Sequence, residues 1–169
     1  MQLRSNWRAG CGMLLLLALG CTNTGSQEDS PVAKAPALPA PKATAQSEPG
    51  PSDPDAPEEF TTTPSGLKYR VLRKSDGRKP KPTDRVLVNY EGKLDNGTVF
   101  DSSYARREPI AFGLNQVIPG WTEGMQHVGE GGKIELEIPG KLGYGAAGSP
   151  PKIPPNATLH FIVELIEIK

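Results

Sequence analysis

Tyr144 is the side chain whose setting most suggests chemistry, because a glycine stands on each side of it. Flanking glycines are typical of a loop, where a large aromatic ring has little reason to pack. Asp101 stands directly before two serines, so its carboxylate fits either a binding site or a turn or cap. Phe100, Trp121 and Phe161 could line an apolar site, although aromatic residues more often belong to a core. These residue types indicate a site that binds through apolar surface and hydrogen bonds.

Covalent and metal-based chemistry is difficult to place in most of this chain. Its two cysteines, Cys11 and Cys21, lie near the N-terminus, so the rest offers no thiol nucleophile, disulfide framework or cysteine-based zinc site. His127 and His160 are far apart in sequence, and zinc needs several ligands, so no metal site is expected. The 19 basic and 19 acidic residues balance, and nothing in this charge pattern suggests a nucleic-acid partner.

The first 21 residues have the features of a secretory signal peptide. Arg4 and Arg8 form a positively charged start, and residues 13–19 (MLLLLAL) form a short apolar run. This run is too short to cross the roughly 30 Å hydrocarbon core of a membrane as a helix. The alternative, a short buried helix, has nothing in the following segment to pack against. We therefore expect the protein to be exported.

The end of this segment, residues 19–21 (LGC), resembles the lipobox of bacterial lipoproteins. The resemblance implies acylation of Cys21, which would supply membrane affinity without a spanning helix. Ala18 departs from the leucine that is usual three residues before the cysteine. Thr22 stands where an aspartate would favour inner-membrane retention, so the resemblance implies an outer-membrane anchor facing the periplasm.

Residues 22–59 form a segment rich in proline and alanine, which we expect to be a disordered tether. Eight prolines fall between Pro31 and Pro57, and apolar side chains such as Val32 and Leu38 are few. Burial of so little apolar surface would not offset the entropy lost on ordering. The tether would hold the following domain away from a membrane, extending by about 3.1 Å per residue where it is polyproline-like.

Residues 60–169 have the length and composition of one globular domain. Apolar and polar residues alternate over 67–71, 86–90 and 133–138, which is the pattern of half-buried strands. The run 159–168 is strand-like on both faces and is therefore expected at the centre of a sheet.

A turn and a helix complete the expected elements. Residues 95–97 (DNG) between two apolar runs predict a hairpin, because Asn-Gly tolerates the positive φ of a tight turn. Trp121, Met125 and Val128 share one helical face, after a Pro-Gly pair and before Gly129. The elements predict an α+β domain in which an antiparallel β-sheet of about five strands wraps around one short helix.

Five stretches of this domain match a known family in their order and spacing. They are 88–92 (VNYEG), 97–103 (GTVFDSS), 117–121 (VIPGW), 142–145 (LGYG) and 153–159 (IPPNATL). Together they resemble the FKBP-type, macrolide-binding peptidyl-prolyl cis–trans isomerases over essentially the whole domain. The resemblance implies an FKBP-like fold and an enzyme that accelerates X-Pro bond rotation during the folding of exported proteins.

The same resemblance implies a shallow apolar pocket. Its lining would comprise Tyr90, Phe100, Asp101, Phe112, Val117, Ile118, Trp121, Tyr144, Ile153 and Phe161. The proline ring would be received by Trp121 as the floor and by Val117, Ile118 and Phe161. Tyr90, Phe100 and Phe112 would wall the pocket.

The polar groups of the implied pocket would orient the substrate. The Tyr144 hydroxyl and the Ile153 backbone N–H would each donate a hydrogen bond to a substrate carbonyl. Asp101 would orient neighbouring donors or meet the polarised amide, without acting as a general acid or base. Bond rotation makes and breaks no covalent bond, so the reaction needs no nucleophile, metal or cofactor.

Some positions differ from better-known members of the family. Ile110 stands where a phenylalanine often lines the pocket, and Gln116 replaces an acidic residue of some members. The loop 148–152 (GSPPK) differs in its prolines and in Lys152. These differences bear on substrate preference and macrolide affinity and leave the expected fold unchanged.

Two other functions fit the same sequence. One is a binding module or chaperone that grips extended apolar chains without accelerating isomerisation. The other is a structural lipoprotein whose tether is its important part. For the isomerase, the expected partners are proline-containing unfolded or exported polypeptides, with macrolides as further ligands. A monomer is expected, because the tether stands where some relatives carry a helical dimerisation domain.

Overall fold

The computed structural model describes residues 46–169. The predicted signal peptide, Cys21 and the larger part of the predicted tether lie outside the described residues. No helix within residues 46–169 is both long and apolar enough to span a membrane.

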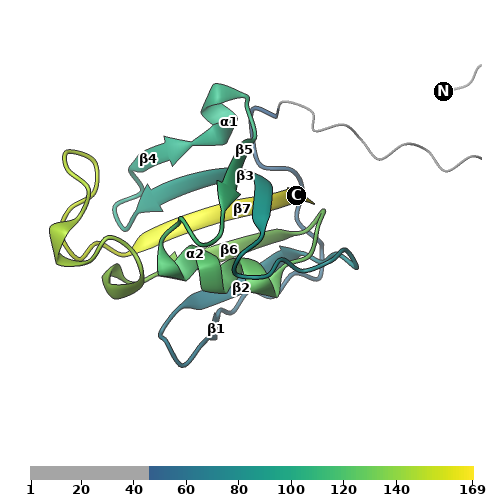
Figure 1. The fold of residues 1–169 in the computed structure, drawn as a ribbon, viewed down its shortest axis with the longest axis horizontal. Coiled ribbons are helices and arrows are strands. Elements are labelled where there is room, and N and C mark those ends of the chain that lie inside the picture. Colours follow the sequence, from purple (N-terminus) through teal and green to yellow (C-terminus); the bar gives the residue numbers. More distant parts are fainter. Residues whose placement is uncertain (1–45) are drawn as a thin grey trace, which may run out of the picture. The chain divides into compact units, whose positions relative to one another are not determined.

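The centre of the domain is one antiparallel sheet with the strand order β1-β2-β6-β7-β3-β4, in which β5 also pairs with β3 (Figure 1). Its strands are β1 (Thr61–Thr62), β2 (Lys68–Arg73), β3 (Arg85–Leu94), β4 (Val99–Ser102), β5 (Ile110–Gly113), β6 (Lys133–Ile138) and β7 (Leu159–Ile168). The predicted strands at 133–138 and 159–168 are confirmed, and β7 is central because it pairs with both β6 and β3.

The α+β fold class is confirmed, and the sheet contains short strands beyond the expected set. The sheet has seven strands rather than the expected five or so. Three of the seven are short, because β1 has two residues and β4 and β5 have four each. Strands this short give too few residues for a period of two to be recognised.

The predicted hairpin joins β3 to β4. Gly97 has φ +79°, and its N–H donates to the carbonyl of Leu94 at 2.8 Å. The side-chain oxygen of Asn96 accepts a hydrogen bond from Thr98 N at 3.0 Å, which is a second hydrogen bond that stabilises the turn. The residue types of the turn therefore act as expected.

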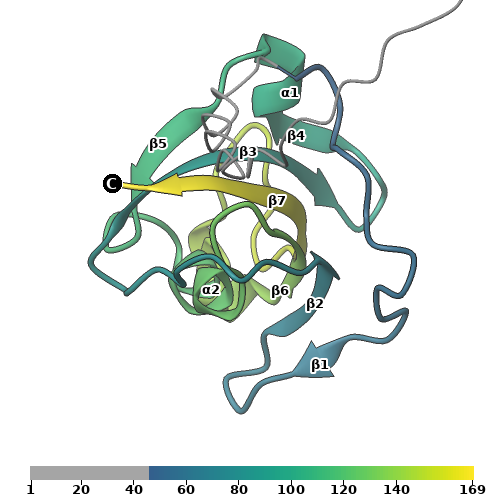
Figure 2. The same cartoon turned by 90° about the vertical axis from the view of Figure 1, so that its right-hand side faces the viewer.

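The helix α2 (Pro119–Gly124) lies in the hollow of the curved sheet (Figure 2). It is shorter than the helical pattern predicted, since Met125–His127 form a 3₁₀ turn and Val128 is extended at φ −120° and ψ 140°. Gly120 and Gly124 are poor helix formers but let α2 approach β6 closely. A Cβ atom at residue 120 would lie 2.5 Å from Ile138 Cγ2.

A second helix, α1 (Ser103–Arg106), was not predicted from the sequence. It is a single turn whose start is capped by Ser102, which accepts a hydrogen bond from Ala105 N at 3.3 Å. Arg107 ends the turn in the left-handed region at φ 54°. The turn carries Arg106 back toward β4.

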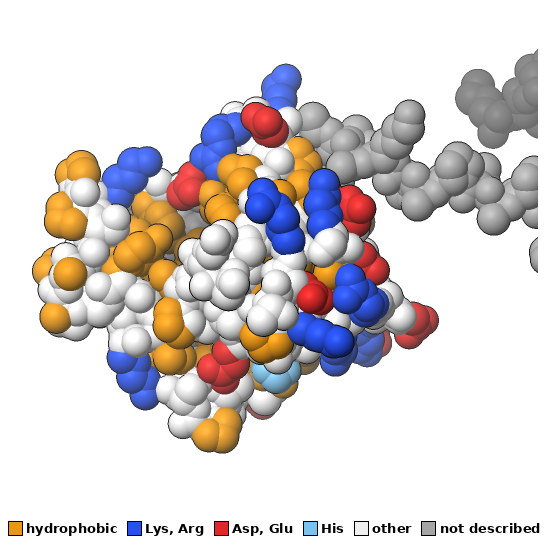
Figure 3. Space-filling model, in the orientation of Figure 1, with side chains coloured by type: hydrophobic (Ala, Val, Ile, Leu, Met, Phe, Trp, Pro, Cys, Tyr) orange, Lys and Arg blue, Asp and Glu red, His pale blue; other side chains and the backbone are white. Residues whose placement is uncertain are grey.

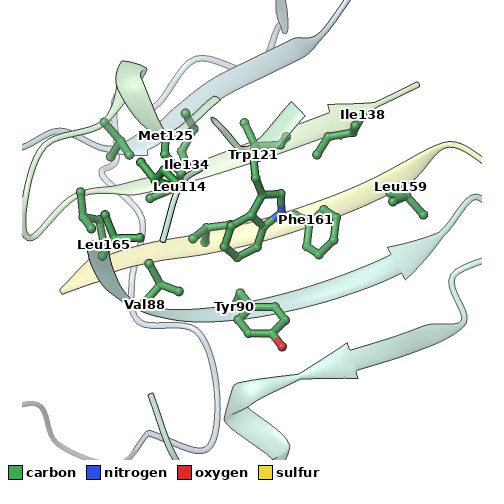
Figure 4. Close-up of a cluster of buried hydrophobic side chains, with 14 of the residues drawn as sticks. Val88, Tyr90, Leu114, Trp121, Met125, Ile134, Ile138, Leu159, Phe161 and Leu165 are labelled. Carbon is green, nitrogen blue, oxygen red and sulfur yellow. The ribbon is translucent and has the colours of Figure 1, made fainter. Parts of the chain in front are cut away.

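The inner face of the sheet, toward α2, forms the hydrophobic core (Figure 4). Alternate residues of the central strands point to this face, and the fully buried ones include Val88, Ile134, Leu136, Val163 and Leu165. Met125 and Leu114 complete the packing from the side of α2.

Residues 46–59, which belong to the predicted tether, run along the outside of the sheet (Figure 2). Hydrogen bonds join them to the sheet, among them Asp53 N to Leu72 O at 2.7 Å and Arg70 Nη1 to Glu58 O at 2.7 Å. Polar groups make this contact, whereas the expectation of disorder rested on the scarcity of apolar side chains alone.

Candidate active site

One open pocket lies between the sheet, α2 and the loop that follows β6, with a volume of about 410 Å³. Its lining residues are Tyr90, Phe100, Asp101, Phe112, Gln116, Val117, Ile118, Trp121, Tyr144 and Phe161. Figure 3 shows hydrophobic side chains gathered around a hollow on this face. Nine of the ten predicted site residues are thus brought together, and Gln116 joins them.

The floor of the pocket is Trp121, which is 4% exposed and belongs to the first turn of α2. Three rings meet the indole edge-on, with centroid distances of 5.4 Å for Tyr90, 5.6 Å for Phe112 and 5.3 Å for Phe161. Figure 4 shows Tyr90 and Phe161 beside Trp121. Edge-to-face packing is one of the favoured arrangements of aromatic rings and stabilises them beyond the burial of their area. The rings therefore form an aromatic cup around the pocket.

Phe100 and Phe161 form one wall at a centroid distance of 5.5 Å. They fit there because β3 carries a glycine beneath them. A Cβ atom at residue 92 would lie 2.6 Å from Phe100 Cζ and 2.7 Å from Phe161 Cε1. Gly92 is thus a further site-forming residue, which could be recognised from the sequence only as part of a family motif.

A polar group at the rim joins Tyr90, Asp101 and Arg106. The Tyr90 hydroxyl donates to the Asp101 carboxylate, and Arg106 donates both to Asp101 and, at 3.0 Å, to the Tyr90 oxygen. Arg106 was not predicted as a site residue, because nothing in its spacing marks an exposed arginine at the end of a single helical turn. The contact closes only because α1 turns the chain back.

These contacts fix the protonation states at the rim. Burial acts to raise the pKa of Asp101, but hydrogen bonds from Tyr90 and Arg106 outweigh it and hold the pKa below its ordinary value. Burial, supported by the bond to Asp101, raises the pKa of Tyr90 to about 12. Asp101 is therefore an anion and Tyr90 a neutral phenol at neutral pH, and neither is suited to shuttling protons.

Tyr144 stands at the mouth of the pocket and is 42% exposed. It follows the 3₁₀ turn Gly140–Leu142 and precedes another at Gly145–Ala147. Gly145 has φ +58°, which explains the glycine after the tyrosine. No described residue hydrogen-bonds the Tyr144 hydroxyl, so it is free to meet a ligand.

Ile153 is the predicted site residue that the structure places elsewhere. It is buried beside the pocket rather than lining it, and its N–H donates to Ser149 O at 2.9 Å. That N–H is therefore occupied and does not point to a substrate. Ile118, just before α2, lines the pocket, and within residues 46–169 its N–H has no recorded acceptor.

Lys152 ties the loop after β6 to the opposite wall. Its ammonium donates to the carbonyl of Phe100 at 3.1 Å, next to the rim. Among residues 46–169, no group of three or more His, Cys, Asp and Glu side chains is arranged to hold a metal ion. What the site offers is an aromatic cup with hydrogen-bond donors at its edge.

The domain is thus a curved antiparallel sheet closed over a short helix, with an aromatic cup between them. Residues 76–166, more than half of the 169, match the family described as FKBP-type peptidyl-prolyl cis-trans isomerase. The chain belongs to this family.

Curated relatives agree with this assignment. FkpA of Escherichia coli strain K12, an FKBP-type peptidyl-prolyl cis-trans isomerase, is 53% identical over 108 residues. That match covers 64% of this chain and 40% of FkpA. The peptidyl-prolyl cis-trans isomerase Mip of Coxiella burnetii is 47% identical over 108 residues, covering 64% and 47% of the two chains. The chain therefore spans less than half the length of these relatives.

Solved structures share the fold. The crystal structure of FkpA from Escherichia coli superposes with a TM-score of 0.64 at 50% identity, covering 67% of this chain and 53% of that one. The crystal structure of AtFKBP13 gives a TM-score of 0.60 at 36% identity and covers 66% and 99% of the two chains.

Proposed function

We propose that this protein is a peptidyl-prolyl cis–trans isomerase that accelerates X-Pro bond rotation in other polypeptides. The observation that carries the proposal is the aromatic cup floored by Trp121, with hydrogen-bond donors at its edge. A proline side chain is a compact apolar ring, and the cup offers it edge-to-face aromatic surface. The family assignment and the named relatives support the same activity.

The reaction needs little from the protein in chemical terms. An X-Pro bond crosses a barrier of about 18–20 kcal/mol when its amide twists out of plane. A thousandfold acceleration requires a lowering of only about 4 kcal/mol. The protein must therefore bind the twisted amide better than the planar one. A twisted amide has less charge separation than a planar one, so an apolar cup favours it relative to the ground state.

The donors at the edge supply orientation. The free hydroxyl of Tyr144 and the free N–H of Ile118 lie on the same pocket and can each donate to a substrate carbonyl. Two such bonds to the backbone around the proline would hold it in a bent shape. Asp101 acts through its bonds to Tyr90 and Arg106, which keep the rim in place.

The test is the cis-to-trans rate of X-Pro peptides with the purified chain. Tyr144→Phe keeps the ring and removes the hydroxyl, so kcat/KM should fall about 2- to 10-fold, the worth of one hydrogen bond. Tyr69→Phe is the matched control, because Tyr69 stacks on His127, which lies outside the pocket lining. A folded parent that gives no acceleration would refute the isomerase function.

Binding of extended apolar chains without isomerisation is the second candidate function. Val99 and Tyr144 are the large apolar side chains most exposed in the described part of the chain, at 47% and 42%. Tyr144 stands on the pocket, and Val99 directly precedes the pocket residue Phe100. Suppression of aggregation of a proline-free client, unchanged in Asp101→Ala, would favour this function.

Export and lipid anchoring belong to the same proposal. Residues 13–19 and Cys21 have the features of a lipoprotein signal, and an acylated cysteine would hold the enzyme in the cell envelope, at the outer membrane facing the periplasm. Mass spectrometry of the mature N-terminus should find a lipid on Cys21, and Cys21→Ser should release the protein from membranes. An unmodified N-terminus that begins at Met1 would contradict both.

A further inference from the structure

The outer face of the sheet buries polar side chains that would ordinarily meet water. Asn89, Lys133 and Glu164 are only 1%, 5% and 3% exposed. They alternate along β3, β6 and β7 with core residues, so they point away from α2 and the pocket. Buried lysine and glutamate are rare unless something satisfies them. Here the covering segment is residues 46–55, which we call the strap.

Lys133 and Glu164 form hydrogen bonds with both polar backbone groups of Gly50, its N–H and its carbonyl. The Glu164 carboxylate accepts a hydrogen bond from Gly50 N at 2.9 Å, and the Lys133 ammonium donates to Gly50 O at 2.6 Å. Lys133 also donates to Ser52 Oγ at 3.2 Å. Lys133 and Glu164 are register partners on β6 and β7, so the sheet itself sets their spacing.

A glycine leaves room for these contacts. A Cβ atom at residue 50 would lie 2.9 Å from Glu164 Oε1 and 3.2 Å from Arg73 Nη1. The first distance is shorter than real Cβ contacts, so a larger residue must displace either these side-chain ends or the strap, and either shift disturbs the hydrogen bond from Gly50 N to Glu164. The glycine is followed by Pro51, which restricts the strap to an extended course.

Further contacts continue toward β2. Arg73 Nη1 donates to Pro51 O at 3.2 Å and to Glu164 at 3.4 Å. Asp53 N donates to Leu72 O at 2.7 Å, and the Asp53 carboxylate accepts from Lys74 N at 2.7 Å. The strap contacts thus pass from β7 to β6 to β2, following the sheet order.

We propose that the outer face of the sheet is a docking site for the chain's own strap, built around the recognition of Gly50 by Lys133 and Glu164. The strap attaches the N-terminal part of the chain to the side of the domain that faces away from the pocket. A force applied to the N-terminal segment would then act on the outer face of the domain. The pocket, on the other side of the sheet, would stay open to substrates. The inference is independent of the isomerase activity.

The test is amide hydrogen exchange of the full chain, read at Gly50 and Asp53, the two strap amides with defined acceptors. In the parent both should exchange at least about tenfold more slowly than in an unstructured peptide. Gly50→Val should remove that protection, with isomerase activity within about twofold of the parent. Pro57→Ala is the matched control on an exposed residue after the strap and should leave protection unchanged.

A second variant keeps the test decisive. Glu164→Gln retains an acceptor but loses the charge, and should increase exchange at Gly50 more than at Asp53, whose acceptor is a backbone carbonyl. Unprotected amides in the folded parent would overturn the proposal. So would protection that disappears on dilution, because the strap of a second copy would then occupy the face.

Discussion

The two faces of the sheet are made by the same strands, and each buries some of its residues, but by different means. On the inner face, Ile134 and Val163 pack into an apolar core that ends in the aromatic cup. On the outer face their neighbours Lys133 and Glu164 are almost as buried, beneath a strap held by hydrogen bonds. Apolar packing is non-directional and supports the whole domain, whereas hydrogen bonds select one partner in one geometry. Substitutions should therefore affect global stability on the inner face and local order on the outer face.

The largest effect is expected at the floor of the cup. Trp121→Ala removes a buried indole that three other rings contact, and should lower the free energy of unfolding by about 3–5 kcal/mol. Urea denaturation followed by circular dichroism measures this loss. A loss below about 1 kcal/mol would mean that the inner face is not the main source of stability.

Replacement of a buried residue on the outer face should change the free energy of unfolding much less. Burial lowers the pKa of Lys133, which reflects the cost of holding its ammonium away from water. Lys133→Met removes that cost together with the bonds to Gly50 and Ser52, and Glu164 keeps Arg73 as a charged partner at 3.4 Å. The free energy of unfolding should therefore change by less than about 1–2 kcal/mol. Exchange at the Gly50 amide should nevertheless increase. Glu137→Gln, in an exposed pair on the same face, should leave that exchange unchanged.

A smaller effect should follow pH at the edge of the inner layer. His127 stacks on Tyr69 at 4.0 Å, and burial, aided by the charge of Lys79, lowers its pKa from 6.5. The unfolded chain then binds the proton more readily, so stability rises with pH through this window and falls as pH drops below about 6.5. Urea titrations from pH 8 to about pH 5 should show the fall. His127→Phe keeps the stack and should reduce the slope, and an equal slope in both proteins would contradict this role.

The smallest expected effect of pH is on the reaction itself. Asp101 is held ionised by Tyr90 and Arg106, and the pKa of Tyr90 is raised to about 12. Neither rim group titrates near neutrality, so kcat/KM should stay level from about pH 5 to about pH 9. A bell-shaped profile would reveal a proton-transfer step that an isomerase of this kind does not need.

The sequence was sufficient for the elements whose patterns are long and local. The alternation over 133–138 and the apolar run 159–168 became β6 and β7, and the Asn96-Gly97 turn formed as expected. Nine pocket residues could be named from the family resemblance, and seven of them lie within its five motifs. Their roles at the site stay predictions until the variants are measured.

The remaining features depend on contacts that no local pattern records. Arg106 reaches the rim only because Ser102 caps a single helical turn. The strap is held by Lys133 and Glu164, which lie 83 and 114 residues away from Gly50 in sequence. A proline-rich composition with few apolar residues predicts disorder, because burial of so little apolar surface cannot offset the entropy lost on ordering. That prediction does not include the stabilisation from long-range hydrogen bonds.

The isomerisation rate of one X-Pro peptide, measured side by side for the parent, Tyr144→Phe and Gly50→Val, tests the division between the faces most directly. The parent should accelerate cis-to-trans rotation, Tyr144→Phe should be slower by about 2- to 10-fold, and Gly50→Val should match the parent within about twofold. Equal loss in Gly50→Val and Tyr144→Phe, with both proteins folded, would contradict the separation of pocket and strap. A folded parent without any acceleration would contradict the catalytic role of the inner face.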